Sequence, residues 1–221
     1  MPLVYRKNLK DHCILGIWEV TETEQYFLDQ LAFWPEEQEQ LDQIKGRKRV
    51  EWLAVRQLVH TLSEREIRGP ILKDEHGKPY LKDSTFFISM SHTNGFAAVI
   101  AAPYPVGVDI QQRWTSILRL KKKFVGNDEM SIVENAEDEI AALHILWGTK
   151  EGLYKAYGRR KIDFKLHLFV DSFEINPSGG FTTAHIRLDS FHQMYDVHYE
   201  LFRDIYFVYV RKKENSENEN L

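Results

Sequence analysis

The segment HILWGTKEGLYKAYG, residues 144–158, places charged side chains beside an apolar stripe. The apolar residues recur at intervals of three, four and seven, which predicts an amphipathic helix that begins near Asp138. They are Ile140, Leu143, Trp147 and Tyr154. Glu151 and Lys155 lie one turn apart on such a helix, so they can form a simple surface ion pair. The same two groups can serve a metal or phosphate site if another segment supplies partners.

A strand that could supply those partners is PVGVDIQQR, residues 105–113. Its apolar residues alternate with polar ones, so Asp109 and Gln111 share the face opposite to the apolar set. A carboxylate and an amide near Glu151 would form a small set of hard oxygen ligands. Mg²⁺ favours such a set, because it keeps several waters and takes one or two carboxylates plus substrate phosphates. The alternative is that Asp109 only decorates an edge strand.

A third polar pair, Ser91 and His92, ends the alternating stretch FFISMSHTNGF before a turn at Asn94 and Gly95. A hydroxyl and an imidazole at the end of a strand suit contacts with phosphate oxygens. The histidine spacing matches no metal cluster such as H-E-x-x-H. A histidine in this place is also compatible with an ordinary hydrogen-bonded structural residue.

The whole chain limits what these residues can do. Its 221 residues are 43% hydrophobic and 13% aromatic, which is enough to fill a core. The net charge of −4 gives no basic field, so we expect no nucleic-acid partner. Cys13 is the single cysteine, which excludes an intrachain disulfide and a multi-cysteine zinc site. No run of eighteen apolar residues is present, so we expect a soluble, cytoplasmic protein that does not enter a membrane.

The order of strands and helices, repeated in two halves, predicts the α+β class. The break at Pro103 to Pro105 is the best junction between the halves. We therefore expect an N-terminal subdomain at 1–104, a C-terminal subdomain with the metal site at 105–212, and a polar, disordered tail at 213–221. Expected elements are strands at 13–20, 86–91, 96–102 and 106–112, a helical pair within 23–64, the helix that carries Glu151, and four β-rich segments after it.

Four segments in this order resemble the 4′-phosphopantetheinyl transferases, specifically the larger type that activates surfactin synthetase. They are GKPYL, FFISMSHTNGFAAVIAA, VGVDIQQ and LWGTKEGLYKA. The resemblance covers roughly residues 13–210. It implies a pseudo-two-fold α/β sandwich of two similar subdomains, with coenzyme A in the cleft between them. It also implies the activity of a holo-[acyl-carrier-protein] synthase.

The resemblance assigns roles to individual residues. Asp109 and Glu151 would bind Mg²⁺, and Glu151 would also accept a proton from the attacking serine. Residues that would contact coenzyme A are Ser91 and His92 at its phosphates, and Lys78 and Pro79 at its adenine end. Lys150 and Lys155 would stabilise phosphate charge. Trp147 would only anchor the helix in the core.

The sequence departs from the family pattern in two places. Gln111 stands where the family usually has a glutamate, and a neutral amide binds a metal only weakly or through water. The stretch PEEQEQLDQ is acidic where family members carry lysines that hold the 3′-phosphate. Arg47, Arg49 and Arg56 are the nearest substitutes, and their alternative is a solvated helix face.

The implied reaction moves the 4′-phosphopantetheine group of coenzyme A to a serine hydroxyl of an acyl or peptidyl carrier protein, with Mg²⁺, and releases 3′,5′-ADP. Both halves of the cleft lie on one chain, so a monomer is expected. The basic run Arg119, Lys121, Lys122 and Lys123 could steer an acidic carrier protein, or could be only a solvated face. Two alternative functions remain. One is another magnesium-dependent phosphotransferase, but the sequence has no P-loop or kinase signature. The other is a non-catalytic coenzyme A-binding or scaffold protein with a decayed metal site.

Overall fold

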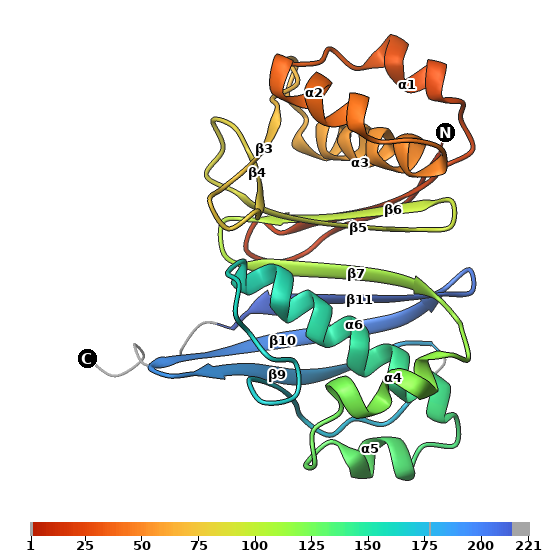
Figure 1. The fold of residues 1–221 in the computed structure, drawn as a ribbon, viewed down its shortest axis with the longest axis vertical. Helices are drawn as coiled ribbons and strands as arrows, with labels where there is room; N and C mark the ends of the chain where they lie inside the picture. Colours follow the sequence, from red (N-terminus) through yellow and green to blue (C-terminus); the bar gives the residue numbers. More distant parts are fainter. Residues whose placement is uncertain (1, 177, 214–221) are drawn as a thin grey trace.

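The computed structural model describes residues 2–176 and 178–213. Two larger antiparallel sheets, a two-stranded ribbon and six helices make up this part of the chain (Figure 1). The predicted α+β class is therefore confirmed. The pseudo-two-fold relation of the halves, and their division at residues 104 and 105, stay proposals.

The N-terminal half is a four-stranded sheet covered on one face by three helices. In spatial order its strands are β1 (Leu3–Asn8), β2 (Ile14–Glu19), β6 (Phe96–Ala102) and β5 (Phe87–Thr93). The helices are α1 (Glu24–Gln30), α2 (Pro35–Gln43) and α3 (Arg47–Ser63), and the ribbon is β3 (Ile71–Lys73) with β4 (Pro79–Leu81). Apolar side chains of α3 pack on the sheet and bury one core between the two layers.

The C-terminal half is a five-stranded sheet with one long helix across it. Its strands, in spatial order, are β7 (Val106–Gln112), β11 (Ile205–Lys212), β10 (Phe191–Phe202), β9 (Gly180–Leu188) and β8 (Leu168–Val170). The helices are α4 (Ile117–Phe124), α5 (Met130–Glu134) and α6 (Glu139–Tyr157). Asp138 accepts a hydrogen bond from the Ala141 amide and begins α6, and Gly158, at φ 68°, ends it.

The two halves meet where β5 and β7, each at the edge of its sheet, lie beside one another. Two serines of β5 join them: the Val108 amide donates to Ser89 Oγ at 3.0 Å, and the Ile110 amide donates to Ser91 Oγ at 3.3 Å. These contacts satisfy amides of β7 that its one neighbouring strand, β11, leaves free. A third apolar core lies between the two sheets.

Glycines let α6 approach the sheet closely. A Cβ atom added at Gly107 of β7 would lie 1.9 Å from the carbonyl oxygen of Gly152, and one added at Gly148 would lie 2.8 Å from Val208 Cγ2. Any larger residue at Gly107 would push the helix away. This close contact brings the polar face of β7 against Glu151 and Lys155.

Most of the expected elements are present. The helix beginning near Asp138 and the alternation that places Asp109 and Gln111 on one face are confirmed. The helical region at 23–64 holds three helices where two were expected, and β1 was not expected. Of the predicted tail, residues 214–221 lie outside the described residues. No helix of the described residues is long and apolar enough to cross a membrane.

Candidate functional site

Asp109 is the centre of a polar cluster between β7, β5 and α6. Its side chain is 9% exposed and accepts three hydrogen bonds. Lys155 Nζ donates to Oδ1 at 2.7 Å, Ser91 Oγ donates to Oδ1 at 3.0 Å, and Gln111 Nε2 donates to Oδ2 at 2.7 Å. A carboxylate has about four lone-pair positions, so one position, on Oδ2, stays free.

Glu151 supplies a second carboxylate to this cluster. Burial is the main cause that raises its pKa; the negative charge of Asp109 raises it further, and Lys155 lowers it. Among the residues that the structure describes, none forms a hydrogen bond or an ion pair with this carboxylate. The cluster therefore holds two acidic groups against one paired lysine, which is a local surplus of negative charge.

Lys155 also retains a free donor. Its ammonium group gives one proton to the Val108 carbonyl oxygen at 2.8 Å and one to Asp109. A lysine has three protons to donate, so the third can bind an anion. The side chain is 24% exposed, which leaves it open to a ligand on the solvent side.

The donor set fits a magnesium ion that completes its shell with water and phosphate oxygens. Asp109 offers one lone pair and Glu151 offers an unpaired carboxylate, and Mg²⁺ usually takes one or two carboxylates from the protein. No group of three or more His, Cys, Asp or Glu residues able to hold a metal lies in the described part of the chain. A metal here would therefore depend on a phosphate ligand for further charge.

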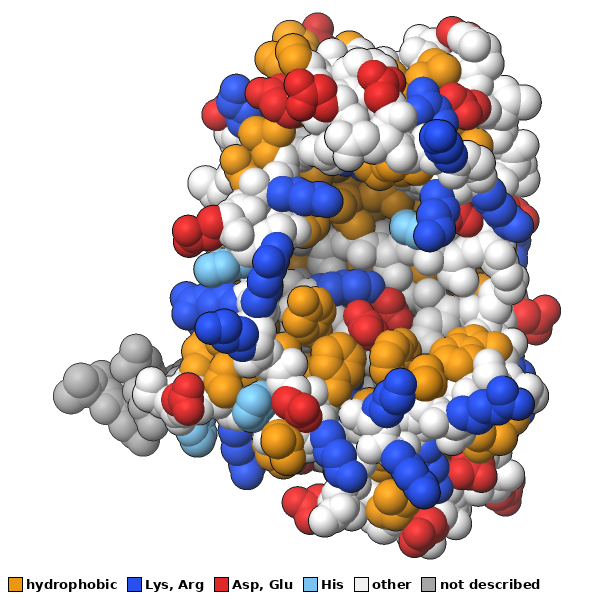
Figure 2. All heavy atoms as spheres, viewed as in Figure 1, with side chains coloured by type: hydrophobic (Ala, Val, Ile, Leu, Met, Phe, Trp, Pro, Cys, Tyr) orange, Lys and Arg blue, Asp and Glu red, His pale blue; other side chains and the backbone are white. Residues whose placement is uncertain are grey.

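A cavity of 220 Å³ lies beside this cluster, between the two halves. Lys155 lines it together with the turn before β4, the strand β5 and the end of α6. Lys78 and Pro79, expected at the adenine end of coenzyme A, both lie in this wall. Figure 2 shows the hollow between the halves, with basic side chains gathered around it and acidic side chains on its lower wall.

Lys78 already serves the fold. Its ammonium group donates to the Ala156 carbonyl oxygen at 2.8 Å, and burial lowers its pKa. A cation in this place satisfies an otherwise unpaired carbonyl at the C-terminus of α6 and complements the helix dipole. Lys78 can thus fix the position of α6 and line the cavity at once.

Ser91 and His92 point in different directions from β5. The one proton of Ser91 Oγ goes to Asp109, so Ser91 holds the carboxylate in place. The side chain of His92 is 46% exposed, and its Nδ1 lies 2.9 Å from Glu51 Oε2. Arg47 contacts the same Glu51 at 3.5 Å and is 64% exposed. His92 and Arg47 therefore remain accessible on the N-terminal side.

Arg49 and Arg56 are not brought to the cleft as free cations. Arg49 pairs with Glu24 at 2.6 Å. Arg56 is 4% exposed and pairs with Glu37 at 3.3 Å, and burial lowers its pKa to about 9. Arg68 binds the same Glu37. Both arginines are held in acid–base contacts inside the N-terminal half, which leaves Arg47 as the accessible member of the three.

Lys150 lies away from the cluster. It has no exposed surface, and its ammonium group donates to Glu129 Oε2 at 2.6 Å and to the carbonyl oxygens of Phe124 and Phe164 at 2.7 and 2.9 Å. All three protons are used, so none is left for a phosphate. Trp147 packs in the core against Phe124, as predicted.

Gln111 lies next to Asp109, but both of its polar atoms are engaged. Nε2 donates to Asp109, and Oε1 lies 3.0 Å from Nδ1 of His144, a fully buried residue of α6. The sequence pattern did not single out His144. The available signal was a histidine on the apolar face of a helix, seven residues before Glu151, where it must find a hydrogen-bond partner.

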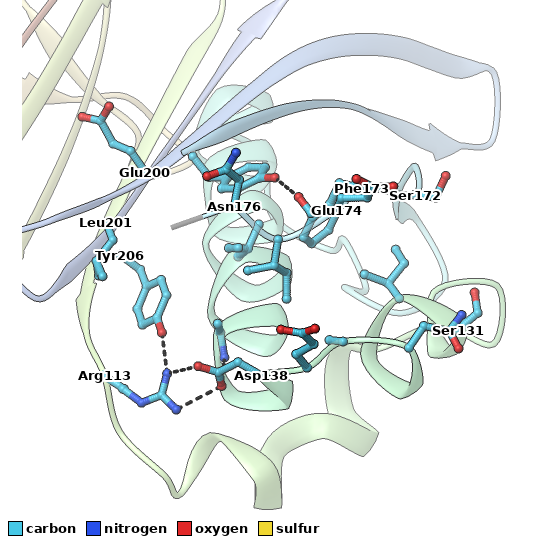
Figure 3. Close-up of a pocket in the computed structure, with 18 of the residues that line it drawn as sticks. Arg113, Ser131, Asp138, Ser172, Phe173, Glu174, Asn176, Glu200, Leu201 and Tyr206 are labelled. Atoms are coloured by element: carbon cyan, nitrogen blue, oxygen red, sulfur yellow. Dashed lines mark hydrogen bonds and ion pairs between the residues drawn. The ribbon is translucent and has the colours of Figure 1, made fainter. Parts of the chain in front are cut away.

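A larger cavity, of 760 Å³, lies near the N-terminal end of α6, and none of the predicted site residues lines it. Figure 3 shows its polar side chains, several of which pair with one another. Arg113 donates to both carboxylate oxygens of Asp138, at 2.7 and 3.0 Å, and to the Tyr206 hydroxyl at 2.8 Å. These bonds hold the first turn of α6 and leave no group in this triad poised for chemistry.

Comparison with known proteins gives a partial match. No protein-family model matches the chain. A curated relative, the 4′-phosphopantetheinyl transferase gsp of Aneurinibacillus migulanus, is 24% identical over 106 residues. The match covers 47% of this chain and 42% of the relative. It supports a relationship to the 4′-phosphopantetheinyl transferase superfamily, and it does not distinguish the surfactin-activating type.

Proposed function

We propose that this protein transfers the 4′-phosphopantetheine group of coenzyme A to a serine hydroxyl of an acyl or peptidyl carrier protein, with Mg²⁺, and releases 3′,5′-ADP. The observation that carries the proposal is the pair of carboxylates, Asp109 and Glu151, held beside Lys155, and Lys155 lines a cavity between the two halves. The four sequence motifs and the partial match to gsp support the same reaction. The surfactin-activating, holo-[acyl-carrier-protein] synthase type is part of this proposal.

In the proposed reaction, Asp109 and Glu151 would hold the metal ion, and the third proton of the Lys155 ammonium group would form a hydrogen bond with a phosphate oxygen. Mg²⁺, when bound, neutralises charge on the pyrophosphate and on the leaving group. Phosphoryl transfer needs little covalent help from a protein, so positioning and charge neutralisation carry most of the rate.

Glu151 is the group best suited to take the proton of the carrier serine. No hydrogen bond or ion pair within the described residues occupies its carboxylate, so an oxygen that does not ligate the metal is free to accept the proton. Asp109 is less suited, because three hydrogen bonds already occupy its carboxylate. The two acids thus differ in role because they differ in partners.

Coenzyme A would lie along the 220 Å³ cavity. Lys78 and Pro79 would contact its adenine end, and His92 and Arg47 would meet phosphate from the N-terminal side. Both walls of the cavity belong to one chain, so we expect the protein to act as a monomer, and size-exclusion chromatography with light scattering tests this. We also propose that the protein is cytoplasmic.

Mass spectrometry of apo carrier proteins tests the proposed reaction. Each carrier is incubated with the protein, coenzyme A and Mg²⁺, and the mass added to the carrier is recorded. We expect a phosphopantetheine increment with the wild type and loss of at least about a hundredfold in rate with Glu151→Gln, the scale expected on removing a general base. Glu134→Gln is the matched control, because this exposed residue of α5 lies outside the cluster.

The absence of any increment on every carrier tried, including those of its own host, contradicts the proposal. Calorimetry of coenzyme A binding then separates it from the non-catalytic alternative. A transferase binds coenzyme A more tightly when Mg²⁺ is present, whereas affinity that is indifferent to Mg²⁺ identifies a binding or scaffold protein.

A further inference from the structure

His144 is a buried imidazole with two specific partners. Its Nε2 accepts a hydrogen bond from the Trp114 amide at 3.1 Å, and its Nδ1 lies 3.0 Å from Gln111 Oε1. The ring stacks on Tyr206 with centroids 4.6 Å apart and planes 4° apart. Trp114 packs edge-on against the same ring at 5.5 Å. The imidazole therefore has one orientation, fixed by α6, β11 and the loop after β7.

These contacts determine where the protons are. A backbone amide can only donate, so Nε2 of His144 must be the unprotonated nitrogen. The proton of a neutral imidazole is then on Nδ1, which donates to Gln111 and requires its oxygen there. The amide group of Gln111 must consequently turn its NH₂ group toward Asp109 Oδ2. The Trp114 amide thus fixes the tautomer of His144, and that tautomer fixes which end of the Gln111 amide is oxygen and which is nitrogen.

We propose that His144 is a positioning residue that acts through Gln111: it fixes the amide of Gln111 as a donor to Asp109 and so holds the proposed metal-binding carboxylate in one orientation. The orientation of Asp109 follows from the hydrogen-bond geometry alone, and its importance for metal binding rests on the proposed function. Gln111 then serves the site by orienting Asp109, with no oxygen directed at a ligand.

The surroundings keep this arrangement in a single protonation state. Burial lowers the pKa of His144 to about 4, so the ring is neutral near pH 7. Arg113 and Asp138 flank the ring with opposite charges and are paired to each other. Hydrogen-bonded partners behind a metal-binding side chain typically change metal affinity or activity about 10- to 100-fold when removed.

The geometry also explains why a glutamine is compatible with this place. A carboxylate at position 111 could accept the proton of His144 Nδ1 with one oxygen. Its other oxygen would then face Asp109 Oδ2, where a donor now lies at 2.7 Å, and two acceptors would meet without a proton between them. In the absence of metal, Gln111→Glu should therefore be less stable than Gln111→Leu.

Nuclear magnetic resonance of the metal-free protein at pH 7 tests the inference directly. Long-range ¹⁵N–¹H correlation should show Nδ1 of His144 protonated and Nε2 unprotonated. His144→Phe should shift the side-chain NH₂ signals of Gln111 and the carboxyl ¹³C signal of Asp109. Tyr206→Phe, which keeps the stacked ring and removes only a hydroxyl, should leave both signals near their wild-type positions.

A double-mutant cycle shows whether His144 acts through Gln111. If it does, adding His144→Phe to Gln111→Leu should cause little further change in the Asp109 signal. In the same series, the Mg²⁺ concentration that half-saturates the coenzyme A complex, measured by thermal shift, should rise about tenfold in each single variant and no further in the double variant.

An Nε2-protonated ring, or a His144→Phe variant whose Gln111 and Asp109 signals match the wild type, overturns the inference. Additive effects in the cycle also overturn it, because they would mean that His144 acts only through packing. The proposed function fails separately: carriers that remain unmodified, together with the expected resonance shifts, refute the transfer reaction and leave the positioning of Asp109 established.

Discussion

Helix α6 contributes adjacent residues, Lys150 and Glu151, to two charged clusters that differ in how completely their charges are paired. Lys150 lies in a closed cluster, where its three protons meet Glu129 and two carbonyl oxygens. Glu151 lies in an open cluster, where burial and then the negative charge of Asp109 raise its pKa, and where Lys155 is already paired with Asp109. Adjacent helix positions point about 100° apart, so one helix can serve both.

The closed cluster is completed by Glu129, which joins three segments of the C-terminal half. Its carboxylate accepts from Lys150, from the Gly126 amide at 2.7 Å and from the Val170 amide at 2.9 Å. Every charge and every donor is matched, so this cluster serves folding. The open cluster keeps unmatched negative charge in a partly buried place, which costs stability and suits a cation. The contrast teaches that pairing, more than burial, separates the two roles.

The largest expected effect is on the closed cluster. Lys150→Met leaves the buried Glu129 without its cation, and breaking a buried ion pair in this way costs about 3–5 kcal/mol of unfolding free energy. Urea denaturation measures the loss. Lys155→Met is the comparison, because that lysine is partly exposed and Asp109 retains two other hydrogen bonds. An equal loss for the two variants would remove the distinction between the clusters.

A second prediction concerns the cost of leaving Glu151 unpaired. Its raised pKa means that the native state binds this proton more tightly than the unfolded state does, so ionisation destabilises the native state at neutral pH. Glu151→Gln should therefore raise the free energy of unfolding at pH 7.5 in EDTA. The gain should disappear below pH 4, where the wild-type carboxyl is protonated in both states.

Urea denaturation at the two pH values checks this prediction, with Glu134→Gln as the exposed control. A gain of the same size at both pH values would show that the stabilisation has nothing to do with the charge of Glu151. No gain in the free energy of unfolding at pH 7.5 would mean that the ionised Glu151 does not destabilise the native state.

A third prediction separates the two causes that raise the pKa of Glu151. Asp109→Asn removes the neighbouring negative charge, so the pKa of Glu151 should fall, while burial, the larger cause, should keep it above its ordinary value. A ¹³C titration of the Glu151 carboxyl without metal measures it. Ser91→Ala, which removes a hydrogen bond and keeps the charge of Asp109, should move the pKa less. A larger shift in Ser91→Ala would contradict the assignment.

The smallest expected effect extends the comparison to the surface of α4. Lys121 pairs with Glu139 at 3.0 Å, whereas no ion pair within the described residues holds Arg119, Lys122 or Lys123. If the unpaired cations steer an acidic carrier protein, changing all three to Glu should raise its apparent KM about fivefold and weaken the salt dependence. Lys121→Gln should change it less. Unaltered carrier kinetics at low salt would mark the run as a solvated face.

Much of the framework of the site could be predicted from the sequence. Local rules determine the start of α6 at Asp138, its end at Gly158, and the alternation that places Asp109 and Gln111 on one face of β7. The sequence did not identify β1, because LVYRKN, at Leu3–Asn8, has weak alternation and depends on pairing with β2.

The arginine substitutes show where sequence reasoning stops. Arg49 and Arg56 stand in a basic stretch, which predicts contacts with phosphate, and spacing along α3 gives no sign of their partners. Those partners, Glu24 and Glu37, lie on other helices and become neighbours only when α1 and α2 pack against α3. These pairs hold Arg49 and Arg56 inside the N-terminal half, away from the cleft, and no local pattern in the sequence reports them.

The sequence alone determined which residue types stand at which intervals, and thereby the helix of Glu151, the strand of Asp109 and the motif order that resembles a transferase. Only the tertiary structure decided that Lys155 meets Asp109 while Lys150 meets Glu129, and that His144 orients Gln111. The physical reason is range. Local backbone geometry fixes which side chains share one face of a helix or strand. Charge pairing and hydrogen bonding depend on which other helix or strand packs against that face, and residues far apart in the sequence decide this.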